Sequence, residues 1–151
     1  MKLQSSNLTR HLASVALTCA MALPTLAHAQ MASSPTLYAQ LGGKPAITMV
    51  VHDMLANVAA DNRINHYFAR TNISHLQMEL VSQICEATDG PCKYTGLNMQ
   101  QAHKGMNLKT ADFNALVEDL QKSMNSNNVP LGLQNQLLNV LAPMEPDVVH
   151  K

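Results

Sequence analysis

The chain has few aromatic side chains and few charges. It contains no tryptophan, three tyrosines and two phenylalanines among its 151 residues, which excludes the aromatic stacking platform that binds bases or sugars. Lysine and arginine together number 10, as do aspartate and glutamate, and no basic run is present. The positive patch typical of a nucleic-acid-binding protein is therefore missing. Hydrophobic residues make up 46% of the chain, enough for the core of a single domain.

The N-terminal residues have the pattern of a secretory signal. Lys2 and Arg10 precede an apolar run over residues 12–23, and the small-residue cleavage site Ala27-His28-Ala29 follows it. The run is shorter than the roughly 20 residues that span a bilayer, so we expect no membrane span in the mature chain; a retained anchor is the alternative. The sequence predicts a signal peptide over 1–29, a flexible leader over 30–36, a folded domain over 37–149 and export to a bacterial periplasm.

Apolar residues recur at helical spacing in four segments, and no segment alternates as a strand would. The segments run over residues 44–60, from Asn72 or Ser74 to Asp89, from Thr110 to a polar break at 125–128, and from Pro130 to Pro143. A short turn over 63–70, a loop over 92–98 and a brief helix over 99–106 complete the pattern. The sequence therefore predicts an all-α domain of four main helices.

Two cysteines, Cys85 and Cys92, remain once the signal with Cys19 is removed. They are separated by six residues that include Asp89-Gly90-Pro91. In an oxidising compartment this spacing allows a disulfide; two free thiols are the alternative.

Among five histidines outside the signal, none is spaced from another His or a Cys as a zinc site requires. His52, His66, His75 and His150 fall at positions typical of solvated side chains. His103 differs, because Met99 and Met106 lie about one helical turn on either side of it, which predicts an inward-facing imidazole. It is either a hydrogen-bonded core histidine or a ligand of a metal or haem iron.

Several short motifs together resemble the truncated haemoglobins, and most of all group 1, the two-over-two helical globins. The motifs are Leu41-Gly42-Gly43, Tyr67-Phe68, Asp89-Gly90-Pro91, Tyr94-Thr95-Gly96, the stretch from Met99 to His103 and Val140-Leu141-Ala142-Pro143. They occur in the family's order from about Leu37 to Val149. The resemblance implies a two-over-two helical sandwich around haem b.

The resemblance also implies roles for individual residues. His103 occupies the place of the proximal iron ligand, Phe68 that of the aromatic on the haem face, and Met99 lines the proximal side. Thr71 and Tyr94 match positions that reach the haem propionates. Leu55, Leu76 and Leu80 stand where oxygen-avid members have Tyr or Gln, which implies an apolar distal pocket. Glu79 stands where some relatives place a cationic propionate partner or a second axial histidine.

The function that we expect is reversible binding of oxygen or another diatomic gas, carbon monoxide or nitric oxide, at a five-coordinate iron. Without a distal donor, bound oxygen loses a hydrogen bond and should dissociate quickly. The alternatives are a haem enzyme such as a nitric oxide dioxygenase or a peroxidase, which requires polar distal groups, an electron-transfer or haem-relay protein, and a globin skeleton that has lost haem. An unidentified reductase is a candidate partner.

Overall fold

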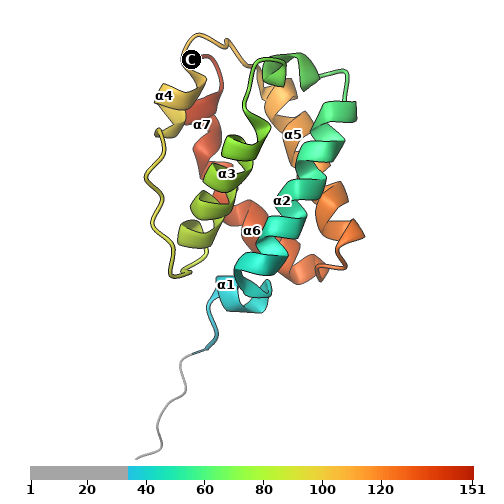
Figure 1. Cartoon of the computed structure of the whole chain (residues 1–151), viewed down its shortest axis with the longest axis vertical. Helices are drawn as coiled ribbons and strands as arrows, with labels where there is room; N and C mark the ends of the chain where they lie inside the picture. The colour runs from blue at the N-terminus through green and yellow to red at the C-terminus, as the bar shows by residue number, and fades with distance from the viewer. Residues whose placement is uncertain (1–33) are drawn as a thin grey trace, which may run out of the picture. The chain divides into compact units, whose positions relative to one another are not determined.

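The structure is a computed structural model and describes residues 34–151. The predicted signal peptide with Cys19, and most of the predicted leader, lie outside these residues. In the part of the chain that is described, every regular element is helical, which confirms the predicted all-α fold (Figure 1). The elements are α1 (Leu37–Gln40), α2 (Gly43–Ala60), η1 (Asn65–Phe68), α3 (Ile73–Ala87), α4 (Met99–His103), α5 (Thr110–Ser126), α6 (Leu131–Leu141), η2 (Ala142–Met144) and α7 (Glu145–Val148).

Helix α2 is central to the packing of residues 34–151. It lies against α3 on one side and α5 on the other, and α6 contacts both α1 and α5. The side chains between them form one apolar cluster in which Val51 and Met124 are fully buried and Leu137 is nearly so. Each such side chain contributes about 1.5 to 3 kcal/mol through the hydrophobic effect. Helices α4 and α7 lie together at one end of the domain (Figure 1).

The short helices differ most from the sequence expectation. Helix α4 ends at His103 and not near residue 106, because Lys104 leaves the helical conformation and Gly105 has a φ of 81°. Helix α7, which contains Pro146, was not predicted, since the last helix was expected to stop at Pro143. Each proline instead lies within the first two positions of its own short helix, η2 or α7, where a missing N–H costs nothing.

A disulfide joins Cys85, near the end of α3, to Cys92 in the following loop, with Cα atoms 5.7 Å apart. Gly90 lets the chain turn back close to the end of α3. Its N–H donates to the Cys85 carbonyl at 2.7 Å, and a Cβ at residue 90 would lie only 2.6 Å from that oxygen. The bond therefore fixes to α3 the start of the loop that carries Tyr94.

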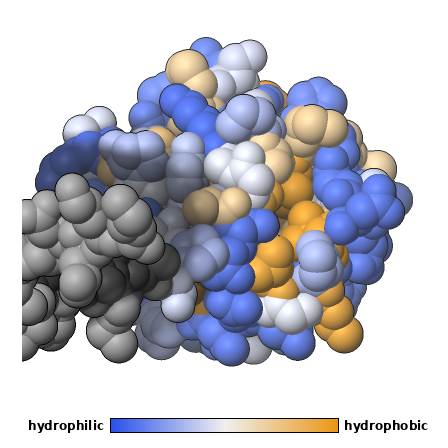
Figure 2. Space-filling view, turned by 90° about the horizontal axis from the view of Figure 1, so that it is seen from below, coloured by the Kyte–Doolittle hydropathy of each residue, from blue (hydrophilic) through white to orange (hydrophobic). Residues whose placement is uncertain are grey.

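One face of the domain exposes apolar side chains in the midst of hydrophilic ones (Figure 2). Met49, 60% exposed, lines a groove with Val50 and Leu133, between the start of α2 and α6. The groove has no titratable side chain, so it offers no acid or base. None of the helices in residues 34–151 combines the length and the hydrophobicity that a membrane span requires.

Candidate haem site

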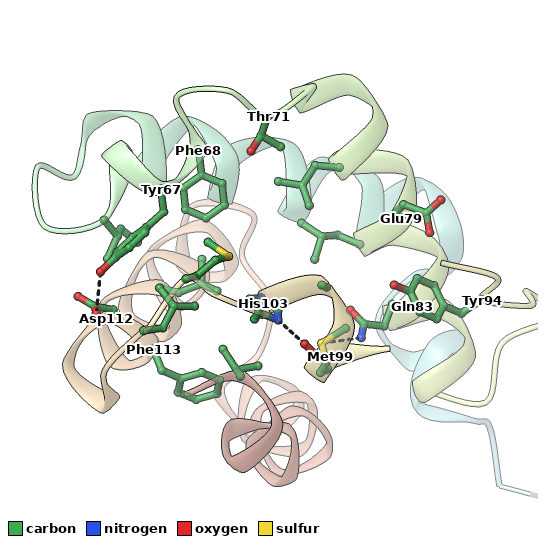
Figure 3. A pocket seen from close by; sticks show the side chains of 18 residues that line it. Tyr67, Phe68, Thr71, Glu79, Gln83, Tyr94, Met99, His103, Asp112 and Phe113 are labelled. Atoms are coloured by element: carbon green, nitrogen blue, oxygen red, sulfur yellow. Dashed lines mark hydrogen bonds between the residues drawn. The ribbon is translucent and has the colours of Figure 1, made fainter. Parts of the chain in front are cut away.

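A cavity of about 250 Å³ opens between α3, α4 and α5, and most of its wall is apolar (Figure 3). It brings together all seven residues predicted to contact the cofactor: Phe68, Thr71, Leu76, Leu80, Tyr94, Met99 and His103. A second apolar cavity of about 190 Å³ extends from it toward α6. Leu80, Met99 and His103 line both cavities, so the two share a wall.

His103 lies in the middle of the first cavity (Figure 3) and is half-buried. Its Nδ1 is 2.8 Å from the carbonyl oxygen of Met99. A carbonyl can only accept a hydrogen bond, so Nδ1 must carry the proton and donate. In the neutral ring Nε2 then has a free lone pair, the form in which imidazole binds a metal ion.

Helix α4, which carries His103, is only five residues long and depends on its N-terminal cap. The Asn98 side chain accepts a hydrogen bond from the Gln101 N–H at 2.9 Å, and the Gln101 side chain accepts one from the Asn98 N–H at 3.4 Å. This reciprocal capping box satisfies N–H groups that a short helix otherwise leaves without a partner.

Two polar side chains on the cavity wall, Tyr67 and Asp112, were not among the predicted site residues. Tyr67 Oη donates to Asp112 Oδ2 at 3.2 Å, and the same oxygen accepts the Lys109 N–H at 2.9 Å. Burial first, and then the hydrogen bond and charge of Asp112, raise the pKa of Tyr67. The chain brings them together over 45 residues, so no local spacing in the sequence indicates the pair.

Gln83 also lines both cavities and lies between two sulfur atoms. Its Nε2 is 3.4 Å from Met99 Sδ and 3.7 Å from Met144 Sδ. The amide thus connects α3 with α4 and η2, and its donor is directed at weak sulfur acceptors. Helical spacing predicted the apolar face of α3 but not this contact.

Leu55, predicted to line the distal pocket, does not do so in this structure. It is 7% exposed and belongs to the core cluster around α2, and it lines neither cavity. Its neighbour Met54 lines the second cavity instead. Consecutive residues of a helix point about 100° apart. Met54 therefore faces the second cavity while Leu55, one residue later, faces the core.

The residues present fit a haem group better than a metal ion held by protein alone. Within residues 34–151 no three or more His, Cys, Asp or Glu side chains gather as a metal site. A porphyrin provides four ligands itself and requires one axial donor, apolar contact and a polar edge. His103, Phe68 with Leu76 and Leu80, and Thr71 with Tyr94 supply these three features respectively.

Comparison with known proteins agrees with this geometry. The family model for bacterial-like globins matches residues 36–150. A group 1 truncated haemoglobin of Tetrahymena thermophila is 35% identical over 108 residues, which cover 72% of this chain and 86% of the relative. The chain belongs to the group 1 truncated haemoglobins. As a member of this family it binds haem and, through haem, diatomic gases.

Further truncated haemoglobins match over most of the described chain. The relative from Mycolicibacterium paratuberculosis is 28% identical over 123 residues, covering 82% of this chain and 90% of its own. The crystal structure of the Tetrahymena pyriformis truncated haemoglobin in its Fe(III) form superposes with a TM-score of 0.75 at 32% identity, covering 78% of this chain and all of that one. The two-over-two haemoglobin of Synechococcus, at 24% identity and a TM-score of 0.72 over the same shares, supports the fold.

Proposed function

We propose that this truncated haemoglobin reversibly binds a diatomic gas at the five-coordinate iron of haem b, with His103 as the proximal ligand. The observation that carries the proposal is the hydrogen bond from His103 Nδ1 to the Met99 carbonyl, which leaves Nε2 free in the middle of the cavity. Haem iron bound there supplies an open coordination position for oxygen, carbon monoxide or nitric oxide. No Cys-x-x-Cys-His sequence precedes His103, so we expect haem b and not haem attached through cysteine thioethers.

A single histidine faces the cavity in the described part of the chain. His75, which belongs to α3, does not line the cavity, and its side chain is 65% exposed. It forms a long ion pair with Glu79, with 3.9 Å between Nε2 and Oε1. This arrangement favours a five-coordinate iron over one with a second axial imidazole.

The wall contributed by α3 favours weak retention of oxygen. Leu76 and Leu80 line the cavity from this helix and have no donor, and the amide of Gln83 is directed at Met99 and Met144. Bound oxygen is polar and is normally stabilised by about 1 to 3 kcal/mol through a distal donor. Fast oxygen release and poor discrimination against carbon monoxide are the expected consequences.

The proposal is tested by optical spectra of the haem-loaded protein in its ferric, ferrous and carbon-monoxide-bound states. A five-coordinate ferrous spectrum that is lost in His103→Ala, and kept in the matched variant His75→Ala, supports gas binding through His103. A six-coordinate ferrous spectrum contradicts it and favours electron transfer. Loss of haem in His75→Ala, with haem kept in His103→Ala, would show that His75 and not His103 is the iron ligand.

We also propose that the protein is exported and acts in an oxidising compartment such as the bacterial periplasm. The charged, apolar and small-residue order of residues 1–29 supports this, and so does the Cys85–Cys92 disulfide, a bond typical of exported proteins. Cell fractionation and the mass of the purified protein test the proposal. A chain that is recovered only from the cytoplasm, with residues 1–29 attached, contradicts it.

A further inference from the structure

A carboxylate and a phenol, Glu79 and Tyr94, lie at one edge of the cavity (Figure 3). Tyr94 Oη donates to the Leu97 carbonyl at 2.7 Å, which fixes the ring. A Cβ on Gly96 would collide with both Glu79 Oε2 and Tyr94 Oη, so the backbone of the loop lies directly against the two side chains. Glu79 is thus confined between its own helix α3 and this loop.

The charge of Glu79 has no strong partner. Its ion pair within residues 34–151 is the 3.9 Å contact with the exposed His75. Burial and the Glu79 charge together raise the pKa of Tyr94, as expected for a phenol beside a carboxylate. The side chain of Glu79 is only 31% exposed, so water screens it less than a fully exposed charge.

The cavity as a whole is acidic. Its wall contains two carboxylates, Glu79 and Asp112, and neither Lys nor Arg among the residues that the structure describes. Asp112 already accepts hydrogen bonds from Tyr67 and from the backbone of Lys109. Glu79 is therefore the carboxylate whose charge remains to act on a ligand.

Haem itself carries two propionate carboxylates. Burying them without partners is costly, so they must lie at a polar edge of the cavity. The polar edges are Glu79 with Tyr94 on one side and Tyr67 with Asp112 on the other, with Thr71 between them (Figure 3). At the edge formed by Glu79 and Tyr94, the propionates meet the charge of Glu79 and no cation of the cavity wall, and like charges placed together are destabilising.

We infer that Glu79 makes haem retention weak, so that ferric haem passes readily to any acceptor with a higher affinity for it. In the transfer, the coordinate bond from His103 Nε2 to iron breaks and one from an acceptor side chain replaces it. No electron moves, and iron stays ferric. The inference rests on haem binding by the family and on His103 as the proposed iron ligand, and not on the binding of a gas.

The test is the rate at which the ferric, haem-loaded full chain loses haem to an excess of apomyoglobin, followed by the change in the Soret band at about pH 8, where imidazoles carry little charge. With acceptor in excess, the rate is set by release. We expect Glu79→Gln to slow release about threefold and Glu79→Lys about tenfold, because a repulsion is first removed and then replaced by an attraction. Glu118→Lys is the matched control: it makes the same charge change on α5, away from the cavity, and should leave the rate within about twofold of native.

A second measurement on the unaltered protein does not depend on how the variants fold. Raising ionic strength from about 0.01 M to about 0.15 M shortens the Debye length from about 30 Å to about 8 Å, so release should become slower in the native chain and stay constant in Glu79→Gln. Release from Glu79→Lys that is as fast as native, or native release that accelerates with salt, overturns the inference. Ferrous and carbon-monoxide-bound spectra of the same samples are recorded before acceptor is added. They test gas binding independently of the rate of haem release.

Discussion

Nδ1 of His103 lies 2.8 Å from the carbonyl oxygen of Met99, one turn earlier in α4. Both groups belong to a helix of five residues, which is too short to be stable alone. The direction of the His103 ring therefore depends on whatever keeps α4 formed. Asn98 does so at the N-terminus, through its bond to the Gln101 N–H.

Replacing Asn98 with alanine should disorder α4 and loosen haem. Loss of an N-cap costs about 1 kcal/mol, and here the cost falls on the element that carries His103, the proposed iron ligand. We expect a lower urea midpoint and faster haem loss. The control is Asn72→Ala, which removes the corresponding cap of α3. The Asn72 side chain accepts a hydrogen bond from the His75 N–H at 3.0 Å, so its loss should lower the urea midpoint while changing the rate of haem loss little. Equal haem loss in the two variants would show that the cap does not position His103.

A donor on the distal wall should slow oxygen release. Leu80→Gln places an amide on the face of α3 that lines the cavity; a hydrogen bond of about 1.4 kcal/mol to bound oxygen corresponds to a tenfold slower dissociation. Stopped-flow displacement of oxygen by carbon monoxide measures the rate. Met78→Gln, two residues earlier and 64% exposed, is the control and should keep the native rate. An unchanged rate in Leu80→Gln would mean that residue 80 does not face the iron.

Long, strongly patterned elements could be predicted from the sequence, because one face of each is buried. Helix α2 follows its stripe of apolar residues from Gly43 to Ala60, and α3 ends at Ala87, shortly before the Asp89-Gly90-Pro91 turn. His103 was singled out by its spacing from Met99, and the structure places both on the cavity wall. These are local properties, which periodicity and turn residues encode directly.

The features that could not be predicted depend on contacts between distant segments, or on which of two neighbouring helical residues faces a cavity. The Tyr67–Asp112 hydrogen bond and the contact of Gln83 with Met144 join elements that lie far apart in the chain. Leu55 and Met54 differ by one position, yet only Met54 reaches a cavity. Helix α7 was missed because the last helix was expected to stop at Pro143, yet Pro143 and Pro146 are both compatible with a first helical turn.

Reduction of the Cys85–Cys92 disulfide should destabilise the domain. Closing so short a loop contributes about 2 to 3 kcal/mol in the chain-entropy view. We expect a thiol reductant to lower the urea midpoint of the native chain, and the double variant Cys85→Ala/Cys92→Ala to have a low midpoint that does not respond to reductant. Because the bond holds the loop that carries Tyr94, haem loss should also quicken on reduction. A native midpoint that is the same with and without reductant would contradict the stabilising role.

Asp61, at the C-terminal end of α2, should make the stability of the fold depend on acid pH. Its carboxylate accepts hydrogen bonds from the Arg63 side chain, including one of 2.7 Å from Nη2, and from the Arg63 backbone N–H at 2.9 Å. These bonds lower the pKa of Asp61 from 3.8 to about 2. A carboxyl group whose pKa is lower in the folded state binds fewer protons there than in the unfolded state. Its contribution to stability is therefore complete above about pH 4 and is lost as the pH falls toward about 2.

The variant Asp61→Asn lacks this titration, so its thermal midpoint should lie below native at neutral pH and approach the native value as the solution is acidified through pH 4 to 2. Comparing the two proteins at each pH cancels contributions that they share, including the acid release of bound haem. Glu118→Gln is the matched control, since Glu118 also pairs with Arg63, at 2.7 Å, but half of its side chain is exposed to solvent. Its midpoint should differ from native by less than that of Asp61→Asn at neutral pH. A gap between Asp61→Asn and native that stays constant down to about pH 2 would mean that the Arg63 pair does not act through the ionisation of Asp61.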